Sequence, residues 1–172
     1  MLSEKMAAAL NEQIGMEAYA SFLYLSMASW CEHQGLDGTS QFFYRQSAEE
    51  HDHMMRMFHY VLEMDNKSIV PSVKQPPEDF ENVQGIFQDV YVHEQKVTSA
   101  INQLVDLANA ENDHSTHNFL QWYVMEQREE EALIRNILDK LKLIGDGPQS
   151  LYFIDKEITG INAQTDSEGG DV

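Results

Sequence analysis

The feature that most constrains the fold of this chain is a carboxylate near the middle of each of four long apolar patterns. Along each pattern, apolar residues recur every three or four positions, which places them on one face of an α-helix. The acids that interrupt these faces are Glu17, Glu50, Glu94 and Glu130. Burying an ionised carboxylate without a partner is energetically costly. We therefore expect the fold to pair these acids or to give them a cation.

The second pattern shows the interruption most clearly. Its apolar face runs through Phe43, Met57 and Tyr60, and the polar residues on the same face include Glu50 and His53. These two residues are one helical turn apart, so their side chains project in the same direction. A carboxylate and an imidazole in this arrangement are candidate metal ligands.

These patterns, and the residues that break them, predict four long helices and a short fifth one. Gly35 is placed to end the first helix, and Asp113 or Ser115 can cap the fourth. The expected ranges are 4–33, 39–66, 81–110, a fourth segment that ends near 144, and 150–161. The fifth segment is too short to be stable alone and too apolar to be free in water, so it must pack on something. We expect one all-α domain over residues 1–163 and a disordered acidic tail over residues 164–172.

The connection between the second and third helices determines the topology. Residues 67–80 contain Pro71, Pro76 and Pro77, which no helix holds in its interior. About 14 extended residues span roughly 45 Å, and a helix of about 28 residues is roughly 42 Å long. The connection can therefore run the length of a bundle and start the third helix parallel to the second. This arrangement is a four-helix bundle with one long crossover.

Composition restricts the possible partners and the compartment. The formal net charge of −18 at pH 7 argues against binding to nucleic acid or to an anionic membrane surface. The single cysteine, Cys31, excludes an internal disulfide and a thiolate cluster. No signal peptide is recognisable, and no stretch approaches the ~18–20 apolar residues of a membrane span. These features favour a soluble, cytoplasmic protein.

Because each interrupting acid lies near the centre of its helix, a bundle brings the acids into one layer. On the fourth helix the inward positions are Glu126, Gln127 and Glu130, whereas Glu129 and Glu131 taken alone are more typical of a solvated helix face. Carboxylates with one imidazole suit a cation such as Fe(II) or Mn(II), and nothing here selects Zn(II) or Cu(I). Two metal ions that share a bridging glutamate are the economical arrangement.

Glu50-x-x-His53 is a motif of ferritin-like di-iron bundles, although this chain has Gln127-x-x-Glu130 where such bundles have a second Glu-x-x-His. Other informative stretches are Leu10-Asn11-Glu12-Gln13, Glu49-Glu50-x-x-His53, His93-Glu94-Gln95, Asn118-Phe119-Leu120-Gln121-Trp122-Tyr123, Glu126-Gln127-x-Glu129-Glu130-Glu131 and Leu151-Tyr152-Phe153-Ile154-Asp155-Lys156-Glu157. Through these motifs, and over roughly residues 1–163, the chain closely resembles the bacterial non-haem ferritins.

The resemblance implies an iron-storage protein with ferroxidase activity. Such a protein oxidises Fe(II) to Fe(III) with O2 or H2O2 and stores it as a ferric oxyhydroxide mineral inside a cage of twenty-four subunits. The catalytic residues that the resemblance implies are Glu17, Glu50, His53, Glu94, Glu130 and Tyr24, a candidate electron donor, with Gln127 near the metal. The residues that it implies around a third, inner iron site are Glu49, Glu126, Glu129 and Glu130. Haem is not expected, because haem-binding relatives have a Met where this chain has His51 or Asp52.

Two other functions are compatible with parts of the pattern. A small di-iron oxidase or peroxide scavenger would oxidise iron without keeping it, but it would not need the apolar fifth segment. A four-helix scaffold with structural acids would bind no iron, and the inward positions of Glu17 and Glu94 argue against it. His51 and His59 fall off the inward face and are expected in solvent, and His93 is expected beside the centre or at the surface.

Overall fold

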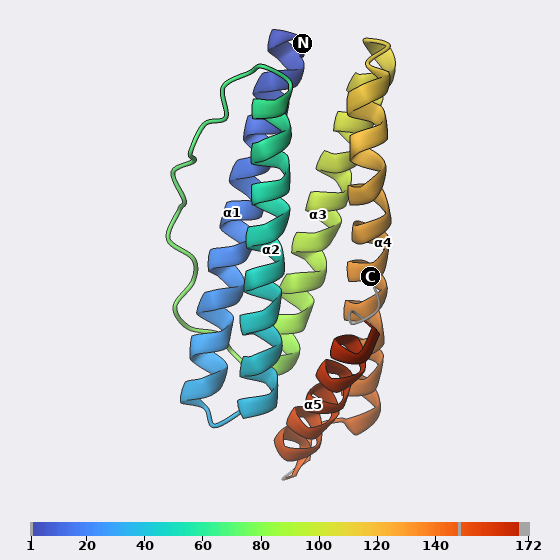
Figure 1. Ribbon diagram of the computed structural model, residues 1–172. Helices are drawn as coiled ribbons and strands as arrows, with labels where there is room; N and C mark the ends of the chain where they lie inside the picture. Colours follow the sequence, from blue (N-terminus) through green and yellow to red (C-terminus); the bar gives the residue numbers. More distant parts are fainter. Residues whose placement is uncertain (1, 148, 169–172) are drawn as a thin grey trace.

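The computed structural model describes residues 2–147 and 149–168, and this part of the chain forms five helices (Figure 1). They are α1 (Glu4–His33), α2 (Asp37–Glu63), α3 (Val83–Ala110), α4 (His114–Ile144) and α5 (Ser150–Glu168). The expected all-α bundle with a fifth helix is confirmed. Helix α5 is longer than the expected 150–161, because it continues to Glu168. The rest of the expected tail, residues 169–172, lies outside the described residues.

The helices form two antiparallel hairpins joined by one crossover (Figure 1). Helix α1 packs chiefly on α2, and α3 packs chiefly on α4. The segment between α2 and α3 runs along the outside of the bundle from the end of α2 to the start of α3, so α3 is parallel to α2 as predicted (Figure 1). Helix α5 crosses one end of the bundle, where it packs on α2 and α4. Within the described ranges, no helix is both long enough and apolar enough to cross a membrane.

Three of the first four helices are capped at their N-termini by the residue that precedes them, and α2 is capped by a residue distant in sequence. Helices α1, α3 and α4 each begin with a side chain that accepts a backbone N–H of the first turn, from Ser3, Asn82 and Asp113 respectively. Helix α2 has no such cap of its own. Instead, the Asp155 carboxylate of α5 accepts the backbone N–H groups of Gly38 (3.0 Å) and Thr39 (2.7 Å). A residue distant in sequence thus stabilises the start of α2 at Asp37, two residues before the expected boundary.

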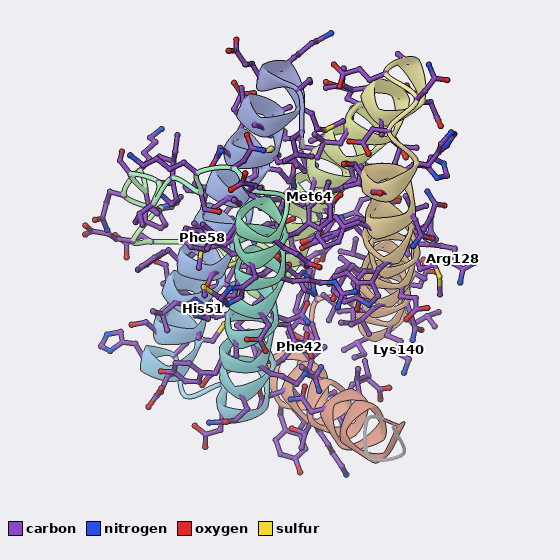
Figure 2. The ribbon with its side chains drawn as sticks, turned by 45° about the horizontal axis from the view of Figure 1, so that its top comes forward. Phe42, His51, Phe58, Met64, Arg128 and Lys140 are labelled. Carbon is purple, nitrogen blue, oxygen red and sulfur yellow. The ribbon has the colours of Figure 1, made fainter. Side chains whose placement is uncertain are left out.

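The buried apolar residues form two clusters, and a polar layer separates them along the bundle. One cluster contains Tyr24, Phe42, Phe43 and Phe87, and the other contains Leu10, Ile14, Val97 and Tyr123. Figure 2 shows side chains filling the space between the helices. The buried polar residues whose positions in sequence fall between the clusters include Gln46, Glu17, Glu50, His53, Glu94, Gln127 and Glu130. The predicted burial of the acids in one layer is therefore confirmed.

Candidate metal centre

Helices α1 and α2 bring three predicted ligands together. Glu17, Glu50 and His53 are buried, with 1%, 3% and 6% of their surfaces exposed. Each offers one ligand atom, and the three atoms lie within 4.8 Å of one another. His53 Nδ1 lies 3.4 Å from Glu50 Oε2, which the one-turn spacing on α2 explains. Two carboxylates and an imidazole at this separation can hold a single metal ion.

Neighbouring side chains fix the orientation of this group. Gln13 Nε2 donates a hydrogen bond to Glu17 Oε1 at 3.0 Å, from one turn earlier on α1. The Tyr123 hydroxyl of α4 donates to the backbone carbonyl of His53 at 2.7 Å, and the Trp122 ring lies edge-on to the His53 imidazole with centroids 5.2 Å apart. Helix α4 therefore holds both the backbone and the ring of His53 in place.

Glu94 and Glu130 face the same layer from helices α3 and α4. Both are buried, and Glu94 accepts two hydrogen bonds. The Tyr24 hydroxyl donates to Glu94 Oε1, and Gln127 Nε2 donates to Glu94 Oε2 at 3.0 Å. Glu94 is thus oriented by donors on α1 and α4, which position it before any metal binds.

Burial and the mutual repulsion of the carboxylates dominate the electrostatics of the layer. Burial, followed by the charge of Glu50, raises the pKa of Glu17 well above its usual range. Burial, followed by the charges of Glu94 and Glu130, does the same to the pKa of Glu50. Burial and the charge of Glu94 raise the pKa of Glu130 to about 8. Burial and the charge of Glu94 also raise the pKa of Tyr24. Burial and crowding therefore favour the protonated forms of Glu17, Glu50 and Glu130, whereas a bound cation would favour their ionised forms.

Two buried oxygens of the layer support this conclusion. Among the described residues, Glu17 Oε2 and Glu130 Oε2 are buried and receive no hydrogen bond from a donor. Buried polar atoms are almost always paired, so such atoms need an explanation. Divalent cations that prefer oxygen and imidazole ligands fit this donor set. The residues present therefore suit a divalent cation of this kind.

A groove of about 270 Å³ next to the layer is lined by the remaining predicted acids. Its lining includes Arg45, Gln46, Glu49, Glu126, Glu129 and Glu130. Glu126 is half-buried and Glu129 is exposed. Glu126 is less buried than expected, because α4 turns Gln127 and Glu130 to the core and leaves Glu126 at the margin, where it lines this groove. Glu49 accepts a hydrogen bond from Gln46 and lies 3.6 Å from the Arg45 guanidinium.

The other histidines lie where the pattern places them. His51 and His59 are exposed. His93 lies beside the layer, with its ring edge-on to Tyr24 at 6.2 Å. Sequence reasoning assigned no supporting role to Gln13, or to Trp122 and Tyr123, which contact His53. Gln13 could have been found from its four-residue spacing to Glu17, whereas the others depend on contacts between helices.

Fold and site together define a four-helix bundle protein with buried carboxylates and His53 at mid-depth. Residues 7–144 match the family described as the ferritin-like domain. The chain is 47% identical over 161 residues to the bacterial non-heme ferritin of Campylobacter jejuni, covering 94% of this chain and 96% of that protein. It is 42% identical over 164 residues to the bacterial non-heme ferritin of Escherichia coli O6:H1, and the match covers 95% of this chain and 99% of that protein. A solved open pore ferritin from the archaeon Archaeoglobus fulgidus has a TM-score of 0.89 and 46% identity, covering 92% of this chain and 96% of that one. This chain belongs to the ferritin family.

Proposed function

We propose that this protein stores iron and has ferroxidase activity. It oxidises Fe(II) to Fe(III) with O2 or H2O2 and keeps the product as a ferric oxyhydroxide mineral. The observation that carries the proposal is the buried group of Glu17, Glu50 and His53, with ligand atoms within 4.8 Å of one another, in a chain of the ferritin family. The names of its relatives as non-heme ferritins also support it.

In this proposal two Fe(II) ions bind side by side in the carboxylate layer. Glu17, Glu50 and His53 hold one ion, and Glu94 and Glu130 hold the other, with Glu50 shared between them. The charges of Glu94 and Glu130 both raise the pKa of Glu50, which is compatible with Glu50 being shared between the two ions. Binding of Fe(II) neutralises the clustered charge and releases the protons that the acids hold.

The oxidation step transfers one electron from each Fe(II). With O2, two Fe(II) and two protons give two Fe(III) and H2O2, and with H2O2, two Fe(II) and two protons give two Fe(III) and two waters. Anionic carboxylates favour Fe(III) over Fe(II), which supplies driving force. Each Fe(III) then reacts with two waters to form ferric oxyhydroxide and three protons. The Tyr24 phenol donates a hydrogen bond to Glu94 and is the candidate donor of a fourth electron when O2 is reduced fully to water. In that reaction three Fe(II), the Tyr24 phenol, O2 and three protons give three Fe(III), a Tyr24 phenoxyl radical and two waters.

The acidic groove formed by Glu49, Glu126, Glu129 and Glu130 is proposed as a third iron site. It is continuous with the buried layer through Glu130, which lines both. A hard cation such as Fe(III) prefers carboxylate oxygens, so the groove offers product a route out of the centre. No role for haem is included, because His51 and Asp52 occupy the positions where a Met would be needed.

We propose that the chain associates with itself into a cage, with twenty-four subunits as the expected number, in the cytoplasm. Helix α5 leaves Leu151, Tyr152 and Phe153 exposed by 53%, 66% and 49%. Adjacent exposed apolar side chains of this size mark an interaction surface. Mineral storage requires an enclosed volume, which a single bundle with a filled core does not provide.

The test is aerobic addition of excess Fe(II), followed by size-exclusion chromatography with iron and protein detected together. Storage predicts ferric iron far above two ions per chain, co-eluting with a large particle. Rapid oxidation limited to the two ions of the centre would support the di-iron oxidase instead. Oxidation at the protein-free rate, with the protein eluting at monomer size, would refute both and leave the four-helix scaffold.

A further inference from the structure

A groove of about 290 Å³ between α3 and α4 reaches the outer side of Gln127. Its lining includes Thr98, Asn102, Arg128, Glu131 and Arg135 in addition to Gln127; Arg128 is labelled on α4 in Figure 2. This groove is separate from the acidic groove near Glu49 and shares no lining residue with it. It connects the surface to the side chain that orients Glu94.

A chain of hydrogen bonds runs through this groove in one direction. Glu131 lies beside the Arg135 guanidinium (3.9 Å), and its carboxylate can only accept. The Thr98 hydroxyl therefore donates its single hydrogen to Glu131 Oε1, at 2.7 Å. With that hydrogen used, Thr98 Oγ1 can only accept from its other neighbour, Gln127 Nε2, which lies 3.4 Å away.

The direction of this chain, together with the backbone oxygen of Glu94 (3.4 Å from Gln127 Nε2), sets the orientation of the Gln127 carboxamide. Gln127 must present its NH2 group, not its carbonyl, toward Thr98. The same nitrogen then donates to Glu94 Oε2 at 3.0 Å. If the amide were flipped, its oxygen would face Glu94 Oε2, the Glu94 backbone oxygen and Thr98 Oγ1, none of which has a hydrogen to donate to it. The Glu94 carboxylate would have to rotate away.

We propose that Thr98 and Glu131 are positioning residues, which hold Gln127 as a donor to Glu94 and so set the orientation of Glu94 toward iron. Gln127 then acts on iron through Glu94, and not as a ligand of its own. The inference deepens the proposed function and rests on it, because Glu94 matters only if the layer binds metal. Outer partners that orient metal ligands typically contribute 10- to 100-fold to metal affinity.

The test uses Co(II) as a redox-stable probe, titrated into the metal-free assembled protein by calorimetry and visible absorbance. Thr98→Val keeps the shape of the side chain and removes the hydroxyl, and Thr98→Ser keeps the hydroxyl. We expect Thr98→Val to weaken the second Co(II) equivalent by about 10-fold and to leave the first unchanged. We expect Thr98→Ser to bind as the original protein does. Ser99→Ala, on the adjacent exposed residue of α3, is the matched control.

A second variant tests the direction of the chain. Glu131→Gln can donate to Thr98, which frees the Thr98 hydrogen for the Gln127 oxygen and so removes the contribution of Thr98 to the orientation of the amide. It should weaken the second Co(II) as Thr98→Val does. In a Gln127→Leu background, neither substitution should have a further effect.

The outcomes separate this inference from the proposed function. If the unsubstituted protein binds fewer than two Co(II) per chain, the paired metal site itself fails. If it binds two and Thr98→Val binds both equally well, the positioning role is refuted. The inference would also be overturned if Thr98→Val weakened both Co(II) equivalents equally. The same holds if it weakened the second equivalent as much in the Gln127→Leu background. In either case Thr98 would act on the bundle generally.

Discussion

The docking of α5 on α2 depends on the absence of a side chain at position 38, so Gly38→Ala should displace α5. A methyl group there would lie 2.0 Å from Thr159 Oγ1 and 2.6 Å from the backbone oxygen of Asp155. The threonine can rotate, but the backbone oxygen moves only with its helix. Restoring an ordinary contact of 3.4 Å requires a shift of roughly 0.8 Å.

That shift would also break the cap that α5 provides. The Asp155 carboxylate lies 2.7–3.0 Å from the backbone N–H groups of Gly38 and Thr39 and from the Thr39 hydroxyl. Stretching these bonds by that amount removes most of their strength. Loss of an N-cap costs about 0.5–2 kcal/mol, and overpacking costs about 1–3 kcal/mol. After a helix-propensity gain below about 1 kcal/mol, we expect a net loss of about 2–3 kcal/mol.

For a chain of this size such a loss corresponds to a fall in Tm of about 5–10 °C. The assay is thermal unfolding of the metal-free protein at one fixed concentration, because assembly adds stability that depends on concentration. Gly160→Ala is the matched control, since a methyl group at that position of α5 meets nothing within 4 Å. The initial rate of Fe(II) oxidation should be unchanged in this variant, whereas the amount of ferric mineral that stays with the protein should be smaller. A Gly38→Ala protein as stable as Gly160→Ala would refute the reasoning.

Three further predictions concern the metal centre. His53→Ala should slow the initial oxidation of Fe(II) at least 10-fold in stopped-flow absorbance, while His51→Ala, on the exposed side of α2, should not; equal rates for the two would remove His53 from the centre. Glu130 has its pKa raised from 4.5 to about 8 by burial and the charge of Glu94, so between these values the unfolded state holds fewer protons than the folded one. The free energy of unfolding of the metal-free protein should therefore be highest at low pH within that window and fall as pH rises through it, by at most about 1.4 kcal/mol per unit from this group. Denaturant titrations should show a flatter pH profile in Glu130→Gln, and an unchanged profile would contradict the assignment. Glu129→Ala, an exposed change in the acidic groove, should leave the first two Co(II) equivalents intact and weaken a third, measured by calorimetry; loss of the first two would place Glu129 in the centre itself.

Much of the site could be predicted because the ligands lie in sequence where apolar residues are expected. Glu17, Glu50 and Glu94 each interrupt a helical stripe, and helical geometry turns that spacing into burial, which the structure confirms. Glu126 shows the limit of this reasoning. One residue before Gln127 on α4, it lies about 100° away around the helix, and only the packing of α4 on its neighbours determines which of the two faces the core.

The residues that orient the ligands could not be found in the same way. Thr98 and Gln127 are 29 positions apart, and their hydrogen bond exists only because α3 and α4 lie side by side. Gln127 could be recognised as an inward position, but Thr98 does not break an apolar pattern in a way that would single it out. The same holds for Asp155, whose sequence context gives no sign that it caps a helix more than a hundred residues earlier.

The sequence by itself therefore determined the number of long helices, the crossover and the identity of the buried acids. These properties follow from local rules: side-chain period, proline in the connection and glycine at a helix end. Only the tertiary structure decided which carboxylate oxygens of the buried layer accept a hydrogen bond and which do not. It also decided where α2 begins. Those features arise from contacts between helices that are distant in sequence, and the direction of a hydrogen bond depends on every group within reach of it.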